Sequence, residues 1–139
     1  MKRSPIWMAV LLAVTLFASN DDMAEKIRLQ NQNVVKAAVE ALSKELPKRV
    51  DPYTQLVGIE ADGERLIYTF EVNAGPRSDE ELKKRKESRT RIVTEGVCRT
   101  SDRFLKSGIV IVYRYVSAAT KKPLFDVVVT KKECPLLDE

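Results

Sequence analysis

Residues 1–19 constrain this chain most, because they decide which part of it folds as a domain and in which compartment. Met1–Arg3 is basic, Ile6–Ala18 is apolar except for Thr15, and polar chain begins at Ser19. This order is typical of a secretory signal. The apolar run of about 13 residues is shorter than the roughly 20 that a membrane-spanning helix needs. We therefore interpret residues 1–19 as a signal peptide.

The cleavage site leaves a second interpretation open. Cleavage after Ala18 or Ser19 places Leu16 or Phe17 three residues before the cut, where a small residue is preferred. The alternative is an uncleaved signal anchor that tethers the protein to the inner membrane. In both cases we expect residues 20–139 to form a single periplasmic domain, since their length is that of one domain.

The composition favours a folded domain and argues against several classes of function. The chain is 44% hydrophobic and 32% charged, with a net charge of +4, and can bury a core. It contains no histidine, the commonest general base and metal ligand. Its glycines are not clustered as in a phosphate-binding loop. We expect no cofactor, no metal site and no catalytic residues.

The chain has two cysteines, Cys98 and Cys134. An even number of cysteines in an exported domain predicts a disulfide. In the chain-entropy treatment, closing this loop stabilises the fold by about 3.8 kcal/mol. The alternative, a metal-binding or reactive thiol pair, requires further ligands or a base, and the sequence offers neither a histidine nor a third cysteine. We predict a Cys98–Cys134 disulfide.

Hydrophobic periodicity predicts a helix and a hairpin, followed by a second helix and hairpin. Apolar residues at three- and four-residue steps predict helices over 22–46 and 79–97. A shorter helical turn is expected over 101–106, closed by Gly108. Pro47 should end the first long helix, and Ser78 should cap the second. Alternating and β-branched residues predict four strands, over 54–60, 64–72, 109–116 and 124–131.

This order predicts an α+β fold, α-β-β-α-β-β, with a four-stranded antiparallel sheet and two helices packed on one of its faces. The strand over 109–116 is apolar on both sides, so we place it in the most buried part of the sheet. Cys134 follows the last strand, and its disulfide would tie the sheet to the second helix. The alternative is a cystatin-like fold, in which a curved sheet cradles one long helix.

The strongest charge feature is the basic run Lys83–Lys86, which Arg89 follows closely. Glutamates are interleaved with it, so one interpretation is a solvated helix surface. The other is a binding surface for an acidic protein, an anionic lipid or a cell-wall polymer. We expect no nucleic acid partner, because no aromatic residue lies within the run for base stacking. The candidate partner-binding residues are Lys83, Lys84, Lys86, Arg89 and Arg114.

Four tyrosines could form an aromatic patch on the sheet, and they are Tyr53, Tyr68, Tyr113 and Tyr115. Core packing with hydroxyl groups at the rim is one interpretation. A recognition surface is the other.

The acidic pairs Asp21-Asp22 and Glu80-Glu81 lie at predicted helix starts, where negative charge is favourable. We interpret them as capping residues rather than catalytic carboxylates.

Several short motifs carry a resemblance to known proteins. They are Leu46-Pro47, Val50-Asp51, Thr54-Gln55-Leu56, Leu66–Phe70, Val97-Cys98, Phe104–Gly108, Tyr113-Arg114-Tyr115 and the closing Cys134. Together they resemble small exported bacterial proteins of unassigned function. The resemblance covers residues 46 to 134. It implies an exported domain tied by a disulfide, and it carries over no catalytic residue.

These observations predict a non-enzymatic exported binding or accessory protein of the bacterial cell envelope. It would act through protein–protein contact, either as a subunit of an envelope assembly or as an inhibitor or immunity factor. One alternative is a structural envelope module that binds anionic lipid or cell-wall polymer. A small periplasmic enzyme ranks third, because the residues for the common mechanisms are missing.

Overall fold

The computed structural model describes the backbone of residues 6–135 and the side chains of residues 20–135. Residues 1–5, the basic start of the predicted signal, lie outside the described residues. The chain forms two compact units, residues 1–30 and 31–139. Among the residues with described side chains, no helix is both long and apolar enough to cross a membrane.

Helix α1 runs from Ile6 to Ser43 and passes from the first unit into the second. It begins before the predicted residue 22 and ends before the predicted residue 46. At its end, the N–H groups of Glu45 and Leu46 donate to carbonyls three residues earlier, which tightens the last turn ahead of Pro47. In the second unit, Val35 of α1 is fully buried.

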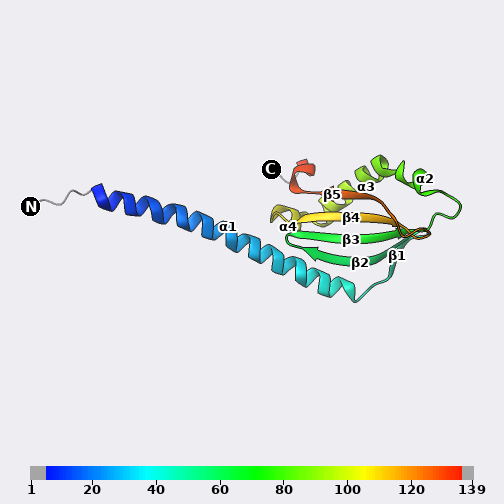
Figure 1. Ribbon diagram of the computed structural model, residues 1–139, viewed down its shortest axis with the longest axis horizontal. Coiled ribbons are helices and arrows are strands. Elements are labelled where there is room, and N and C mark those ends of the chain that lie inside the picture. The colour runs from blue at the N-terminus through cyan, green and yellow to red at the C-terminus, as the bar shows by residue number, and fades with distance from the viewer. Residues whose placement is uncertain (1–5, 136–139) are drawn as a thin grey trace, which may run out of the picture. The chain divides into compact units, whose positions relative to one another are not determined.

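The sheet has five strands in the order β1-β2-β3-β4-β5 (Figure 1). Their bounds are Lys48–Asp51, Thr54–Asp62, Arg65–Val72, Val110–Ser117 and Pro123–Val129. The prediction of four antiparallel strands is wrong in two respects. Strand β1 is additional, and β3 pairs with β4 in parallel, so the sheet is mixed. The two predicted hairpins, β2–β3 and β4–β5, are confirmed.

The parallel pair follows from the connection between β3 and β4. This segment contains helices α2 (Asp79–Lys83), α3 (Lys86–Thr100) and α4 (Asp102–Lys106), which carry the chain back to the end of the sheet where β3 begins. Strand β4 is therefore flanked by β3 and β5, and Val112 is as fully buried as Ile111 although they point to opposite faces. Apolar residues on both faces are typical of such interior parallel strands.

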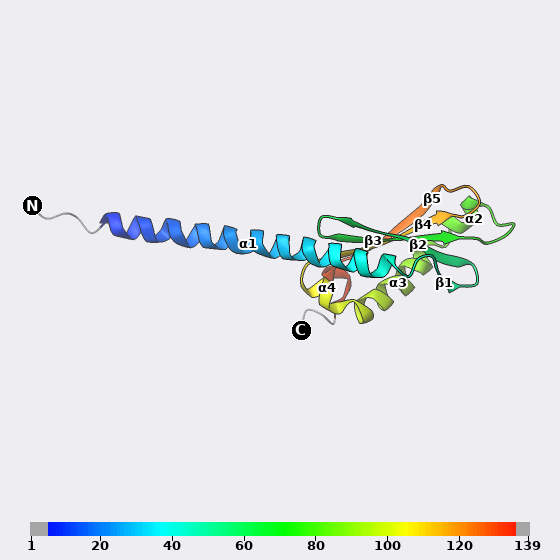
Figure 2. The same ribbon diagram turned by 90° about the horizontal axis from the view of Figure 1, so that it is seen from below.

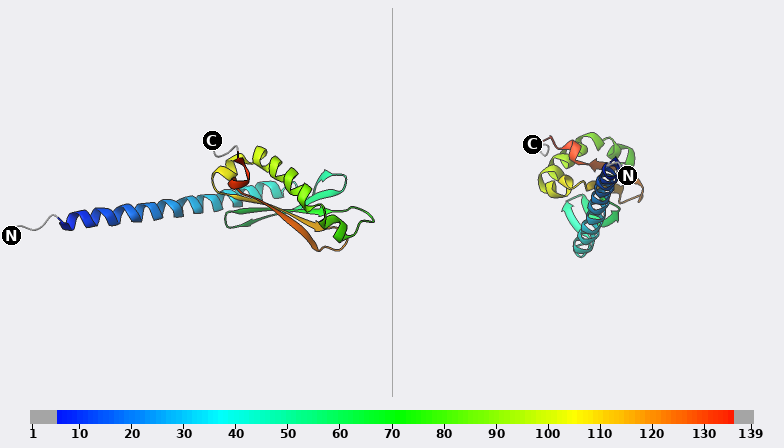
Figure 3. Two further views of the ribbon diagram at one scale, coloured as in Figure 1. Left: turned by 90° about the horizontal axis from the view of Figure 1, so that it is seen from above. Right: turned by 90° about the vertical axis from the view of Figure 1, so that its left-hand side faces the viewer.

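Helices α1, α3 and α4 pack against one face of the sheet. Leu66 of β3, Ile111 of β4 and Val129 of β5 are fully buried in one core that also contains Val35 of α1 and Val97 of α3. Figures 2 and 3 show α3 and α4 on the same side of the sheet. The α+β class and the one-sided helix layer are confirmed. The cystatin-like alternative is wrong, because several helices share this face.

The helix predicted over 79–97 is divided into α2 and α3. The N–H group of Arg85 donates to the carbonyl of Leu82, three residues earlier, at 3.1 Å, and this tight step interrupts the α-helical ladder. The predicted cap is confirmed, since Ser78 Oγ accepts a hydrogen bond from the N–H of Glu81 at 3.3 Å. Gly108, which has a φ of 96°, follows α4 as expected.

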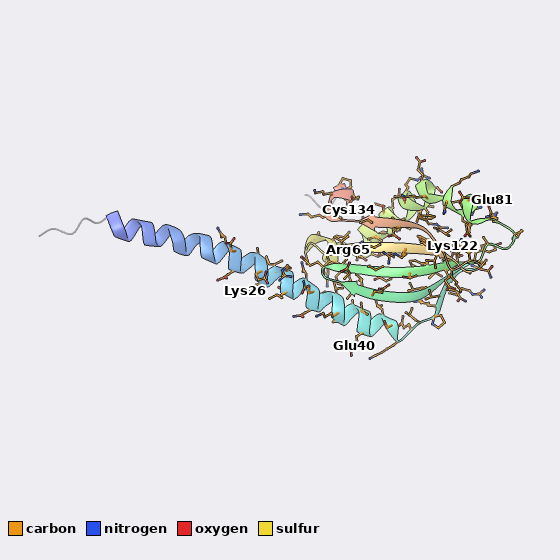
Figure 4. All side chains as sticks on the ribbon, in the orientation of Figure 1. Lys26, Glu40, Arg65, Glu81, Lys122 and Cys134 are labelled. Carbon is orange, nitrogen blue, oxygen red and sulfur yellow. A yellow bond between two sulfur atoms is a disulfide. The ribbon has the colours of Figure 1, made fainter. Side chains whose placement is uncertain are left out.

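The predicted disulfide joins Cys98 on α3 to Cys134, with their Cα atoms 5.6 Å apart. Cys134 lies just beyond β5 and the short helix Lys131–Glu133 (Figure 4). Thr130 and Glu133 form a capping box that fixes the chain ahead of the cysteine. The bond therefore holds α3 to the segment that follows the last strand.

Replacing Cys98 and Cys134 together by Ala should lower the free energy of unfolding by about 3 to 4 kcal/mol, because the unfolded chain regains the entropy of an open loop. Urea unfolding followed by circular dichroism measures this change. A reducing agent should lower the stability of the wild-type protein by a similar amount and leave the double variant unchanged. Equal stability of wild type and variant would contradict the prediction.

Candidate functional site

Two adjoining cavities, of about 520 and 440 Å³, lie beside α3 and share Asp51, Thr54, Arg89 and Tyr115. Together we call them the α3 groove. Helix α3 forms one wall, and β1 with the turn that follows it forms the other. Strands β3 and β4 form the floor of the second cavity, and Leu124 and Phe125 of β5 also line the first.

The floor of the α3 groove is aromatic. In the parallel register Tyr68 of β3 lies opposite Tyr113 of β4, and Phe70 lies opposite Tyr115, so all four rings share one face of the sheet. The ring centroids of Phe70 are 4.9 Å from Tyr113 and 5.2 Å from Tyr115, within the range of favourable aromatic pairs. Tyr68, Tyr113 and Tyr115 thus lie side by side, and this arrangement agrees both with core packing and with a recognition surface.

Burial keeps these tyrosines neutral over the physiological pH range. Loss of solvent raises the pKa of Tyr68 and the pKa of Tyr115 to about 12, and it also raises the pKa of Tyr113. The guanidinium of Arg89 lies 5.8 Å from the ring centre of Tyr115 and partly opposes this rise in its pKa. The floor is an uncharged surface with phenolic hydroxyl groups.

Three arginines, Arg77, Arg85 and Arg89, line the first cavity. Arg85 and Arg89 are one helical turn apart at the start of α3, and Arg77 precedes α2. None of the three forms an ion pair with a carboxylate among the residues with described side chains. Asp51, which also lines this cavity, accepts a hydrogen bond from the N–H of Tyr53 at 2.8 Å. This end of the groove therefore carries excess positive charge.

The second cavity has exposed apolar groups on both walls. Ile92 of α3 is 58% exposed, and Val50 of β1 is 50% exposed. Gly96, one turn after Ile92, also lines this cavity, and a Cβ atom built there would meet no atom within 4 Å. A glycine inside a helix costs roughly 0.5 to 1 kcal/mol relative to alanine. Packing within the protein does not require Gly96.

The structure separates the predicted partner-binding residues. Lys83 pairs with Glu80 at 3.4 Å, while Lys84 lies on a different surface together with Arg91. Lys86 is exposed at the first position of α3, and only Arg89 lines the α3 groove. Their proximity in sequence does not place these side chains on one face, because successive helical residues point in different directions.

Arg114 lies on the opposite face of the sheet from Tyr113 and Tyr115. Its guanidinium donates to both carboxylate oxygens of Asp126 on β5, at 3.2 and 3.4 Å. Arg114 therefore does not line the α3 groove.

The sequence analysis did not identify Arg77 and Arg85 as groove residues. The four-residue spacing of Arg85 and Arg89 was the available signal, because it places both on one side of a helix.

No protein-family model matches this chain, and no curated protein matches it in sequence. Its fold is similar to that of three solved structures. A Pseudomonas aeruginosa protein described as secreted aligns with a TM-score of 0.70 and 16% identity, over 78% of this chain and 96% of that chain. The pilotin EpsS of the Vibrio vulnificus type 2 secretion system aligns with a TM-score of 0.63 and 15% identity, over 79% and 96%.

The third structure is the type II secretion system pilotin AspS of Vibrio cholerae. It aligns with a TM-score of 0.58 and 19% identity, over 81% of this chain and 98% of that chain. These similarities show that the α+β fold is shared over nearly the whole of each solved chain.

The buried tyrosines predict how stability depends on pH. Because the folded pKa values of Tyr68 and Tyr115 are raised from 10.0 to about 12, their stabilising effect is complete below pH 10 and is lost as the pH rises through 12. Urea unfolding at increasing pH should show stability falling above about pH 10. A Tyr68→Phe, Tyr115→Phe variant should show a smaller fall. Complete tyrosinate absorbance near pH 10 in the folded protein would contradict this prediction.

Proposed function

We propose that this chain is an exported, non-enzymatic accessory protein of the bacterial envelope that binds a segment of a partner envelope protein in the α3 groove. The observation that carries the proposal is the groove itself, which combines an aromatic floor with exposed Ile92 and Val50 on facing walls. Exposed apolar groups around a concave surface are typical of protein-binding sites.

The shape of the groove favours a protein segment over a small substrate. Small-molecule sites enclose most of their ligand. The second cavity of the α3 groove instead extends along α3 from Arg89 to Thr100, with solvent-exposed side chains on its rim. A non-enzymatic role also agrees with the sequence, which has no histidine to serve as a general base.

The similar structures support the cellular setting that we propose. One is described as secreted, and two are pilotins of type II secretion systems. We therefore favour a subunit or assembly factor of an envelope machine over an inhibitor or immunity factor. Binding to anionic lipid or cell-wall polymer, the alternative from the sequence, has no support in these similarities.

Export is part of the proposal. We assign residues 1–19 as a signal peptide, or as an anchor to the inner membrane, and residues 20–139 as the periplasmic domain. The Cys98–Cys134 disulfide supports an oxidising compartment, since such bonds are rare in the cytoplasm.

Site-specific crosslinking tests the use of the groove. A photoreactive amino acid at Ile92, in the full chain expressed in its native bacterium, should capture an envelope protein, because Ile92 is exposed at the groove. Val128 is the matched control: it is 46% exposed on β5 and lines neither cavity of the groove. The same adduct at both positions, or at neither, would contradict the proposal.

Filling the groove should block the partner without harming the fold. In a Gly96→Leu variant the new side chain enters open space, and leucine favours a helix more than glycine does. We expect the urea midpoint to stay equal or rise, and the adduct from Ile92 to fall at least about ten-fold. Gly96→Ala is the smaller-volume control. An undiminished adduct in the leucine variant would exclude the second cavity as the binding site.

A further inference from the structure

We propose that the segment bound in the α3 groove is acidic and amphipathic. Its carboxylates would pair with Arg77, Arg85 and Arg89, and its apolar side chains would contact the aromatic floor. This inference rests on the proposed function and specifies the chemistry of the partner.

The three arginines belong to two separate segments of the chain. Arg77 lies between the turn at Gly75, which has a φ of 65°, and the helix cap at Ser78. Arg85 and Arg89 begin α3, where the N–H of Arg89 donates to the carbonyl of Arg85 at 3.0 Å. The break between α2 and α3 thus brings side chains from both sides of α2 to one cavity. Their like charges favour an anion among them.

Three acidic residues near these arginines, Asp51, Asp79 and Glu80, already have partners within the chain. Glu80 pairs with Lys83 at 3.4 Å, and Asp79 accepts a hydrogen bond from the Thr120 hydroxyl at 2.7 Å. This bond is the main reason why the pKa of Asp79 is lowered, and Ser117 adds to the effect. Asp51 accepts from the backbone of Tyr53. The arginine cluster is therefore available to an acidic group from outside the described chain.

Arg89 is oriented for this role. Its guanidinium lies over the ring of Tyr115, which leaves the edge of the planar group, with its N–H donors, able to bind a carboxylate. A guanidinium beside an aromatic surface is also less hydrated than one in open solvent, so a charge-assisted hydrogen bond to it is stronger.

Charge complementarity by itself would also suit an anionic polymer or lipid headgroup. The second cavity decides between them, because Ile92 and Val50 are exposed there and an apolar group that covers them is stabilised by the area removed from water. An amphipathic peptide supplies acidic and apolar side chains together, within the length of one continuous groove. A polysaccharide or a headgroup supplies only the charge.

Charge reversal tests the inference in the full chain with the crosslinker at Ile92. Arg85→Glu with Arg89→Glu should lower the adduct yield at least about ten-fold. The matched control is Lys84→Glu with Arg91→Glu, which changes the net charge equally on a surface outside the α3 groove. The control should leave the yield within about two-fold. Circular dichroism and urea unfolding establish that both variants fold.

Mapping the crosslinked peptide completes the test. It should contain Asp or Glu beside apolar residues, and changing those acids to Lys should restore the adduct with the Arg85→Glu, Arg89→Glu variant. Three outcomes would overturn this inference but not the proposed function. The adduct yield could fall equally with both charge-reversed pairs, it could stay unchanged with the Arg85→Glu, Arg89→Glu pair, or the captured segment could contain no acidic residue. No protein adduct from wild type, or an adduct with polymer or lipid, would overturn the proposed function and this inference together.

Discussion

The parallel pairing of β3 with β4 is the constraint on which the rest of the structure depends. It places Tyr68 beside Tyr113 and Phe70 beside Tyr115, so that two rows of rings form one continuous floor. The same connection that makes the pair parallel carries α3 back across that face, where Val97 joins the core with Leu66. An antiparallel pairing would have removed the need for this crossover and the groove that it creates.

The position of α3 then determines the chemistry of the groove. Its buried side anchors it to the sheet, and the disulfide at Cys98 holds its C-terminal half to the segment after β5. The remaining side presents Arg89, Ile92 and Gly96 to the cavities. One short helix therefore supplies charge, apolar surface and open space along a single edge, and this combination is the basis on which we propose a peptide-like partner.

Local patterns predicted much of the fold. The turn at Gly108 and the cap at Ser78 follow from backbone geometry within a few residues, and the disulfide was predicted from the even cysteine count. Strand β1 was missed because its four residues are mostly exposed and show no alternation of apolar and polar side chains. The pairing of Arg114 with Asp126 was also missed, because periodicity does not reveal which residue lies across the sheet.

By itself, the sequence determined the α+β class, the helix and hairpin segments, the cysteine pair and the absence of histidine chemistry. These depend on short-range periodicity or on residue type alone. Only the tertiary structure decided the parallel pairing of β3 with β4, the gathering of Arg77 with Arg85 and Arg89, and the open space at Gly96. The physical reason is that these features arise between segments distant in sequence, and the packing of a common core decides which of those segments meet.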